Sequence, residues 1–289
     1  MMKITGKTKI LGIIGNPIEH SLSPIIQNRA IALLNLDYTY VPFPVMEDDI
    51  KTALDGFRAV DIKGFNVTIP HKQAVMPFLS HITNTAKLIG AVNTVWQTPD
   101  GWHGTNTDID GFIAPLKALN RSWADVTPII LGNGGASRAV IVGCAQLGCK
   151  EIKVVGRNID KLKEFQNSWD YQLLQAKVTI HPWDELTEIL PQSDLIVNTT
   201  PLGMSPHTDK SPLNNQQISL LKPGAIVYDL IYTPRPTLLL QQAQKQGATI
   251  IDGTEMLVQQ GAVGFEIWTG KKAPVDVMRD ALLDFLPQN

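Results

Sequence analysis

The chain has 289 residues, of which 44% are hydrophobic and 18% are charged, and its formal net charge is −2 at pH 7. This length favours two domains, and the balanced composition is typical of a globular protein. The small net charge and the lack of a basic run argue against nucleic-acid and membrane-surface binding. No stretch reaches the roughly 18 apolar residues of a membrane span, and the apolar run near the N-terminus is too short for a signal peptide.

Cysteine and histidine residues form no metal or redox motif. Cys144 and Cys149 lack C-x-x-C spacing, and the six histidines are scattered without an H-E-x-x-H pair. We therefore expect no metal site and two buried, reduced thiols, as in a cytoplasmic protein.

The first hundred residues alternate between strand and helix patterns. Alternating or β-rich apolar runs predict strands, and apolar residues three and four apart predict helices. The expected strands are 10–14, 38–44, 64–69 and 91–97, and the expected helices are 24–34, 50–59 and one beginning at 75–79. This βαβα order predicts an α/β domain with a largely parallel sheet.

The pattern changes after Gly104, so we expect the boundary between the domains within 104–125. A helix at 106–119 precedes a strand at 126–131, which runs into a glycine-rich turn and an apolar helix. The further strands are expected at 151–155, 195–198, 225–230 and 249–251, and the further helices at 159–169, 237–246, 255–268 and 275–286.

The glycine-rich turn spans Gly132 to Ser137, between a strand and a helix. Gly132 permits the tight turn, and Gly134 lets backbone N–H groups approach a pyrophosphate at the positive end of the helix. The third position of the fingerprint is Ser137 instead of glycine or alanine. The strand–turn–helix context nevertheless predicts a Rossmann-type dinucleotide-binding domain.

The tip of the next strand predicts which cofactor binds. An NAD site usually has an acidic residue there, whereas this strand ends in Gly156-Arg157-Asn158. A guanidinium is suited to a 2′-phosphate, so we predict NADP, although Arg157 as a solvated turn residue is the alternative.

Four polar clusters lie at the ends of elements in the first domain, namely HSLSP (20–24), NVTIPHK (66–72), AVNT (91–94) and NTDIDG (106–111). Ser23 before Pro24 is typical of a helix N-cap, and Asp108 has the same structural alternative. Ligands of open parallel sheets gather at the carboxyl ends of strands, so the clusters together suit a small polyhydroxylated carboxylic acid. Lys72 beside Asp108 would exchange a proton with an oxygen that changes between carbonyl and alcohol, which predicts oxidoreduction of a C–OH group.

These motifs resemble the shikimate dehydrogenase family. The matching segments are HSLSP, NVTIPHK, GAVNT (90–94), NTD (106–108), GNGGASRA (132–139), GR (156–157), Tyr232 with Pro234, and DG-x-x-ML-x-x-QG (252–261). They occur in order over nearly the whole chain. The resemblance implies reversible NADPH-dependent reduction of 3-dehydroshikimate to shikimate, in the biosynthesis of aromatic amino acids.

The resemblance also implies roles for individual residues. Lys72 would be the acid/base residue, with Asp108 as its partner. The substrate contacts would be Ser21, Ser23, Thr68, Asn93, Asp108, Tyr232 and Gln260. The cofactor contacts would be Gly132, Asn133, Gly134, Gly135, Ala136, Gly156, Arg157, Asn158, Lys161, Leu230 and Gly253. Three positions depart from the family, where alanine is common at Asn133, asparagine at Gly156 and arginine at Lys161. Asn133 is expected to project away from the pyrophosphate and to be harmless, whereas the changes at Gly156 and Lys161 predict weaker cofactor binding.

The resemblance further implies that the last helices return to the first domain. We expect a substrate-binding and catalytic domain at 1–108 plus 254–289 and an NADP-binding domain at 109–253. The expected partner is a small-molecule substrate, with no nucleic acid and no membrane, and a homodimer is left open. Two alternatives remain: a relative that oxidises quinate, often with NAD, and a non-catalytic NADP- or ligand-binding sensor.

Overall fold

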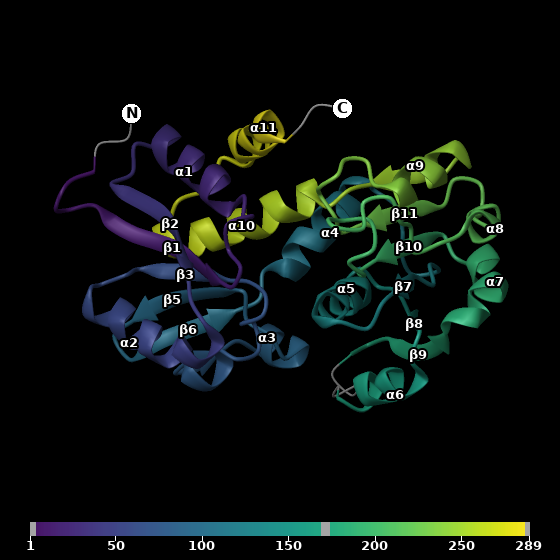
Figure 1. The fold of residues 1–289 in the computed structure, drawn as a ribbon, viewed down its shortest axis with the longest axis horizontal. Coiled ribbons are helices and arrows are strands. Elements are labelled where there is room, and N and C mark those ends of the chain that lie inside the picture. Colours follow the sequence, from purple (N-terminus) through teal and green to yellow (C-terminus); the bar gives the residue numbers. More distant parts are fainter. Residues whose placement is uncertain (1–3, 169–173, 287–289) are drawn as a thin grey trace. The chain divides into compact units, whose positions relative to one another are not determined.

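The computed structural model describes residues 4–168 and 174–286 (Figure 1). The described residues divide into two compact units, one of 4–111 and 257–286 and the other of 112–256 without the gap. The division falls inside α4 (Asp108–Ala118) and α10 (Thr254–Thr269), three residues beyond each predicted domain boundary. The last helices belong mainly to the first unit, as the resemblance implied.

The sheet of the first unit has the order β2-β1-β3-β5-β6-β4. Its strands are β1 (Lys9–Gly15), β2 (Tyr38–Pro44), β3 (Gly64–Val67), β4 (His81–Ile82), β5 (Thr94–Thr98) and β6 (Gly101–Thr105). The pairs β1–β2, β1–β3 and β4–β6 are parallel, whereas β5 runs antiparallel to both β3 and β6. The predicted largely parallel sheet is therefore present, with β5 reversed.

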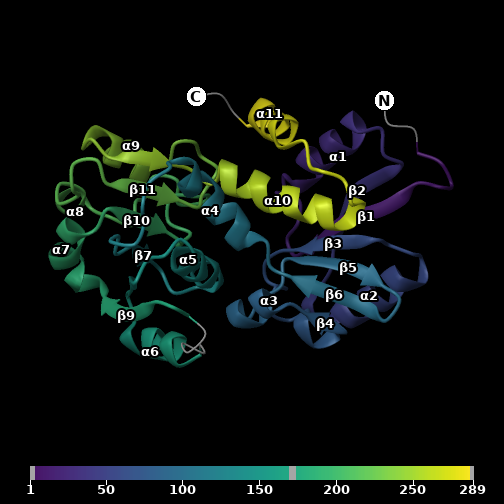
Figure 2. The same ribbon diagram turned by 180° about the vertical axis from the view of Figure 1, so that it is seen from behind.

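Both faces of this sheet are covered, because its strands alternate buried apolar residues to either side. On one face Leu11 and Ile13 pack with α1 (Ser23–Leu33), α10 and α11 (Val275–Phe285). On the other face Ile14 and Phe65 pack with α2 (Ile50–Ala59) and α3 (Asn84–Ile89). Figures 1 and 2 show these two groups of helices on opposite sides of the sheet.

Several elements differ from the sequence-based expectations. The strand predicted to reach Ile69 ends at Val67, because a turn already begins at Ile69-Pro70. The predicted helix at 75–79 is only a 3-10 turn, Met76–Phe78, because the backbone is already extended at Leu79. The hairpin partner β6 and helix α3 were not predicted, because elements of five and six residues are too short to give a clear periodic signal.

The sheet of the second unit is parallel throughout its described strands, in the order β12-β11-β10-β7-β8-β9. These strands are β7 (Ile129–Leu131), β8 (Glu151–Gly156), β9 (Lys177–Pro182), β10 (Leu195–Asn198), β11 (Ile226–Asp229) and β12 (Thr249–Ile251). Strand order reverses between β7 and β10, which is the topology of a doubly wound dinucleotide-binding sheet. The predicted α/β fold class is confirmed.

The helices of the second unit are α5 (Gly135–Gln146), α6 (Ile159–Asn167), α7 (Leu186–Ile189), α8 (Asn215–Ile218) and α9 (Leu238–Lys245), with 3-10 turns at Trp183–Glu185 and Leu190–Gln192. Leu186, Ile218 and Leu239 build the core on one side of the sheet. Trp169, the last residue of the helix predicted from 159, lies outside the described residues.

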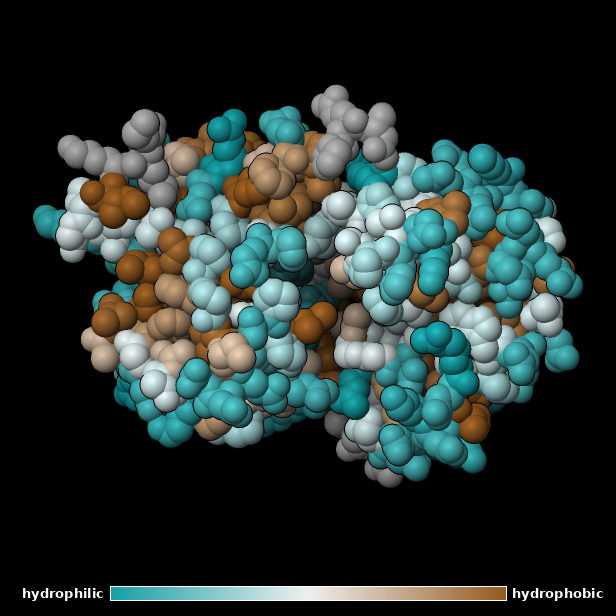
Figure 3. All heavy atoms as spheres, in the orientation of Figure 1, coloured by the Kyte–Doolittle hydropathy of each residue, from teal (hydrophilic) through white to brown (hydrophobic). Residues whose placement is uncertain are grey.

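No helix in the described part of the chain is long and apolar enough to cross a membrane. Cys144 and Cys149 are both free and buried, as predicted. Figure 3 shows hydrophobic residues scattered among hydrophilic ones on the face in view.

Candidate active site

The reversed strand β5 gathers the polar clusters of the first unit at one edge of its sheet. Asn66, near the carboxyl end of β3, is paired with Thr94, the first residue of β5, and Thr94 is paired with Thr105, the last residue of β6. Asn93 and Asp108 therefore emerge beside the end of β3. Asn93 was predicted inside a strand, but it immediately precedes β5, where its side chain turns to the site.

Lys72 and Asp108 form an ion pair at this edge. Lys72 Nζ lies 2.7 Å from Asp108 Oδ2, and the side chains are 30% and 14% exposed. The backbone carbonyl of Lys72 accepts a hydrogen bond from Val92 N at 2.8 Å, which ties the turn after β3 to the segment before β5. The amine is thus held by its backbone and by its carboxylate, yet remains accessible to a small ligand.

Asn93 holds the other oxygen of Asp108. Its Nδ2 donates to Asp108 Oδ1 at 2.9 Å, and its Oδ1 accepts from Thr107 N at 2.8 Å. The backbone N–H of Asp108 donates to Asn106 Oδ1 at 3.0 Å. Asp108 is therefore held by hydrogen bonds from or to Lys72, Asn93 and Asn106, and its carboxylate already faces Lys72.

Two further predicted substrate residues of the first unit, Thr68 and Gln260, lie close to this network. Thr68 follows β3 directly, and its N–H donates to Ile14 O at 3.0 Å. Gln260 of α10 is 9% exposed, and its Oε1 lies 3.5 Å from Asn93 Nδ2.

The helix cap expected at Ser23 is wrong. Leu22 occupies the N-cap position of α1 without a side-chain cap, and Ser23 is the first helical residue. Ser21 Oγ instead accepts the N–H of Ser23, at 3.4 Å. The buried Ser23 hydroxyl is therefore not used for capping.

The glycine-rich turn of the second unit follows β7 at the point where strand order reverses. Gly132 has φ = +104°, a conformation that side chains disfavour. Gly134 caps α5 without a side-chain hydrogen bond, and a Cβ at Gly134 or Gly135 would meet no atom within 4 Å. The first N–H groups of α5 thus have neither a side-chain cap nor a Cβ above them, which fits a pyrophosphate.

The tip of β8 presents the predicted 2′-phosphate residues. The Arg157 side chain is exposed and makes no hydrogen bond or ion pair with the described residues. Asn158 caps α6, accepting Lys161 N at 2.9 Å, so it has a structural role whether or not it meets a cofactor. A Cβ on Gly156 would lie 2.9 Å from Leu162 and 3.2 Å from Asn133 Oδ1, so an asparagine at Gly156 would require repacking.

Leu230 and Gly253 meet at the carboxyl end of β11. A Cβ on Gly253 would lie 2.0 Å from the carbonyl oxygen of Leu230, so only glycine permits this approach. The neighbouring Asp229 is fully buried, and burial raises its pKa to about 6. Tyr232 follows in the same unit, half-buried, and burial raises its pKa as well.

Comparisons with known proteins assign the family. Residues 13–95 match the shikimate dehydrogenase substrate binding domain, 116–215 match shikimate / quinate 5-dehydrogenase, and 253–283 match the shikimate 5′-dehydrogenase C-terminal domain. A shikimate dehydrogenase (NADP(+)) of Crocosphaera subtropica is 58% identical over 282 residues, which cover 98% of each chain. The chain belongs to the shikimate dehydrogenase family. The resemblance predicted from the motifs is thereby confirmed.

Solved structures of shikimate dehydrogenases share the fold. One, in complex with NADP+, is 38% identical, with a TM-score of 0.88 over 99% of this chain and 98% of its own. Another, from Listeria monocytogenes in complex with shikimate and NAD, is 33% identical, with a TM-score of 0.87 over 98% and 99%. Shikimate dehydrogenases have thus been crystallised with either dinucleotide.

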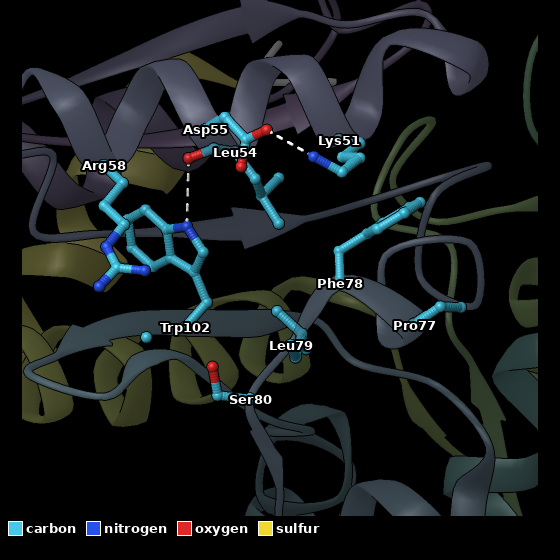
Figure 4. Close-up of a pocket in the computed structure, with 10 residues that line it drawn as sticks. Lys51, Leu54, Asp55, Arg58, Pro77, Phe78, Leu79, Ser80 and Trp102 are labelled. Carbon is cyan, nitrogen blue, oxygen red and sulfur yellow. Dashed lines mark hydrogen bonds and ion pairs between the residues drawn. The ribbon is translucent and has the colours of Figure 1, made fainter.

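A groove elsewhere on the first unit is not part of this site. It has a volume of about 310 Å³ and lies between α2 and two short segments, 77–80 and 101–102 (Figure 4). Its lysine, Lys51, is exposed and paired with Asp55 at 2.7 Å, and Trp102 Nε1 donates to Leu54 O. None of the predicted site residues lines it.

Sequence reasoning did not single out the buried polar side chains beneath the site. Tyr40 and Asn66 are 1% and 4% exposed and are joined by a hydrogen bond of 2.7 Å. A usable signal was present, because asparagine is disfavoured inside a strand such as β3. His71, expected to be structural or exposed, is fully buried, and its Nε2 lies 2.6 Å from Val45 O.

Proposed function

We propose that the chain catalyses the reversible, NADPH-dependent reduction of 3-dehydroshikimate to shikimate. It is an oxidoreductase of the shikimate pathway, which supplies aromatic amino acids. The observation that carries the proposal is the pair of Lys72 and Asp108, with Nζ 2.7 Å from Oδ2, in a chain 58% identical to a shikimate dehydrogenase (NADP(+)). Because that pair is kept, the non-catalytic sensor has no support.

Lys72 is the proton donor of the reduction. NADPH supplies the hydride to the carbonyl carbon, and the ammonium of Lys72 delivers a proton to the carbonyl oxygen. Asp108 accepts a hydrogen bond from the amine and keeps Nζ in one direction. In the reverse direction the neutral amine takes the hydroxyl proton as the hydride leaves.

The substrate contacts follow from the polar side chains around this pair. Ser21 and Ser23 supply hydroxyls at the start of α1, and Thr68 supplies another beside Lys72. Asn93 and Gln260 already use their amides within the site, so each would contact the substrate by exchanging a hydrogen bond. The remaining contacts assigned to the substrate are Asp108 and Tyr232.

The cofactor contacts lie in the second unit. The backbone of the turn from Gly132 to Ala136 and the N-terminus of α5 suit the pyrophosphate, and Arg157 with Lys161 suits the 2′-phosphate. Gly156, Asn158, Leu230, Gly253 and Asn133 complete the proposed contacts. The first unit is accordingly the substrate-binding and catalytic domain, and the second is the NADP-binding domain.

A cytoplasmic location and a homodimer complete the proposal, and light scattering of the purified protein tests the assembly.

An absorbance assay at the nicotinamide band tests the activity. Shikimate and quinate are each incubated with NADP+ and with NAD+. We expect the highest kcat/KM for shikimate with NADP+. A higher kcat/KM for quinate with NAD+ would instead identify a quinate dehydrogenase, and no reduction of either cofactor would refute the proposed enzyme.

A further inference from the structure

A hydrogen-bonded chain of buried side chains runs beneath the active site, and Tyr40 lies at one end of it. The Tyr40 ring is packed against Trp268 of α10, with 6.0 Å between ring centroids. Its hydroxyl lies 2.7 Å from Asn66 Oδ1. Burial raises the pKa of this phenol well above 10, so the hydroxyl keeps its proton at any physiological pH.

One backbone carbonyl determines how the side-chain amide of Asn66 is oriented. Asn66 Nδ2 lies 3.1 Å from Asn93 O, which can only accept a hydrogen bond. The amide nitrogen of Asn66 must therefore face Asn93, and its oxygen must face Tyr40. Tyr40 then has to be the donor, because an amide oxygen cannot donate.

The chain continues from Asn66 to the catalytic carboxylate. Asn66 Nδ2 also donates to Thr94 Oγ1 at 3.1 Å, and Thr94 Oγ1 donates to Asn93 Oδ1 at 3.0 Å. Asn93 Nδ2 in turn donates to Asp108 Oδ1 at 2.9 Å. Asn66 thus supports both the backbone and, through Thr94, the side chain of the residue that orients Asp108.

We propose that Tyr40 is a positioning residue for the reaction, which orients Asp108 toward Lys72 through Asn66, Thr94 and Asn93. This inference rests on the proposed function. A phenylalanine would fill the same place in the core that Tyr40 shares with Leu11 and Phe265, without burying a hydroxyl. The tyrosine adds only that hydroxyl, which donates a hydrogen bond to Asn66.

The test is Tyr40→Phe, which removes one oxygen and keeps the ring against Trp268. We expect kcat/KM for shikimate to fall about tenfold, mainly through a lower kcat. The KM for NADP+ should stay unchanged, because the proposed cofactor contacts lie in the other unit. The matched control is Tyr38→Phe, two residues earlier in β2, which should leave every constant unchanged.

A double-mutant cycle with Thr94→Val separates positioning from a general loss of stability. If Tyr40 acts through Asn66 and Thr94, the fall in kcat of the double variant should be clearly smaller than the product of the two single falls. Thr94→Val alone should lower kcat, because it removes the donor to Asn93 Oδ1, and an unchanged kcat in this variant would show that the chain does not orient Asp108. Unchanged kinetic constants in Tyr40→Phe with a lower melting temperature would overturn the inference and leave the proposed function intact. A wild-type enzyme inactive with shikimate would overturn both.

Discussion

The two candidate sites of this chain are built in opposite ways. Around Asp108 in the first unit, buried side chains bond to one another, and both carboxylate oxygens have partners. At the glycine-rich turn of the second unit, bare backbone lies at the start of α5, and the Arg157 side chain is exposed without a partner among the described residues.

This difference matches the chemistry proposed for each site. Proton transfer requires an amine held in one direction before the substrate arrives, which a satisfied network provides. Recognition of a phosphate requires free donors that the ligand itself satisfies. Substitutions in the first cluster should therefore act mainly on kcat, and substitutions at the turn should act mainly on cofactor KM.

The largest expected effect is that of Lys72→Ala. Loss of the proton donor should lower kcat by about 10²–10⁴-fold, with a smaller change in KM for shikimate. Initial-rate assays measure both constants. Lys51→Ala is the matched control, because Lys51 also pairs with an aspartate 2.7 Å away but lies in the separate groove. Near-normal turnover of Lys72→Ala would remove this lysine from the mechanism.

Arg157→Ala should weaken the binding of the cofactor without lowering kcat. Loss of a charge-assisted contact to the 2′-phosphate should raise the KM for NADPH about 10–100-fold and leave the KM for NADH nearly unchanged. The ratio of the two values is the measurement. An equal rise for both cofactors would show that Arg157 does not distinguish them.

Asp229 and Asp108 differ in their hydrogen-bond donors. Asp108 faces the lysine amine of Lys72, whereas the donors to Asp229 are all neutral, namely Asn198, Thr237 and the N–H of Ile231. Burial raises the pKa of Asp229 from 3.8 to about 6, so between these values the folded protein holds a proton that the unfolded chain has lost. The contribution of Asp229 to the free energy of unfolding is therefore fully present below pH 3.8 and is lost as the pH rises through 6. Its loss between pH 4 and pH 7 should be about 2 kcal/mol.

Urea unfolding of the wild type and of Asp229→Asn at both pH values measures this loss. The variant lacks the titrating carboxyl, so the difference in unfolding free energy between the two proteins should change by that amount. A pH-independent difference would mean that Asp229 keeps an ordinary pKa in the fold.

The smallest expected effect concerns Asn158, which caps α6 and is also proposed to meet the cofactor. Asn158→Ala should lower the free energy of unfolding by about 1 kcal/mol, and Asn158→Ser should restore most of it. If the asparagine also contacts NADPH, both variants should raise its KM. A KM restored together with stability in the serine variant would assign Asn158 to the cap alone.

The elements that could be predicted have signals contained within a few residues. The bounds of β2 and α2 agree with the sequence-based ranges, because the period of their apolar residues is set by local backbone geometry. The turn at Gly132 was recognisable, because phosphate-binding turns demand glycine. The pairing of Lys72 with Asp108 was proposed from strand ends and from the family motifs, and the two side chains lie together.

What the sequence alone determined was therefore the alternation of strands and helices, the glycine-rich turn and the set of polar residues at strand ends. Only the tertiary structure decided that β5 runs backwards, which places Asn93 beside Asp108, and that Tyr40 and Asn66 support this pair from below. Strand direction and side-chain partners depend on pairing between segments far apart in the chain. The local periodicity of a strand is the same in either direction, so no short stretch of sequence records them.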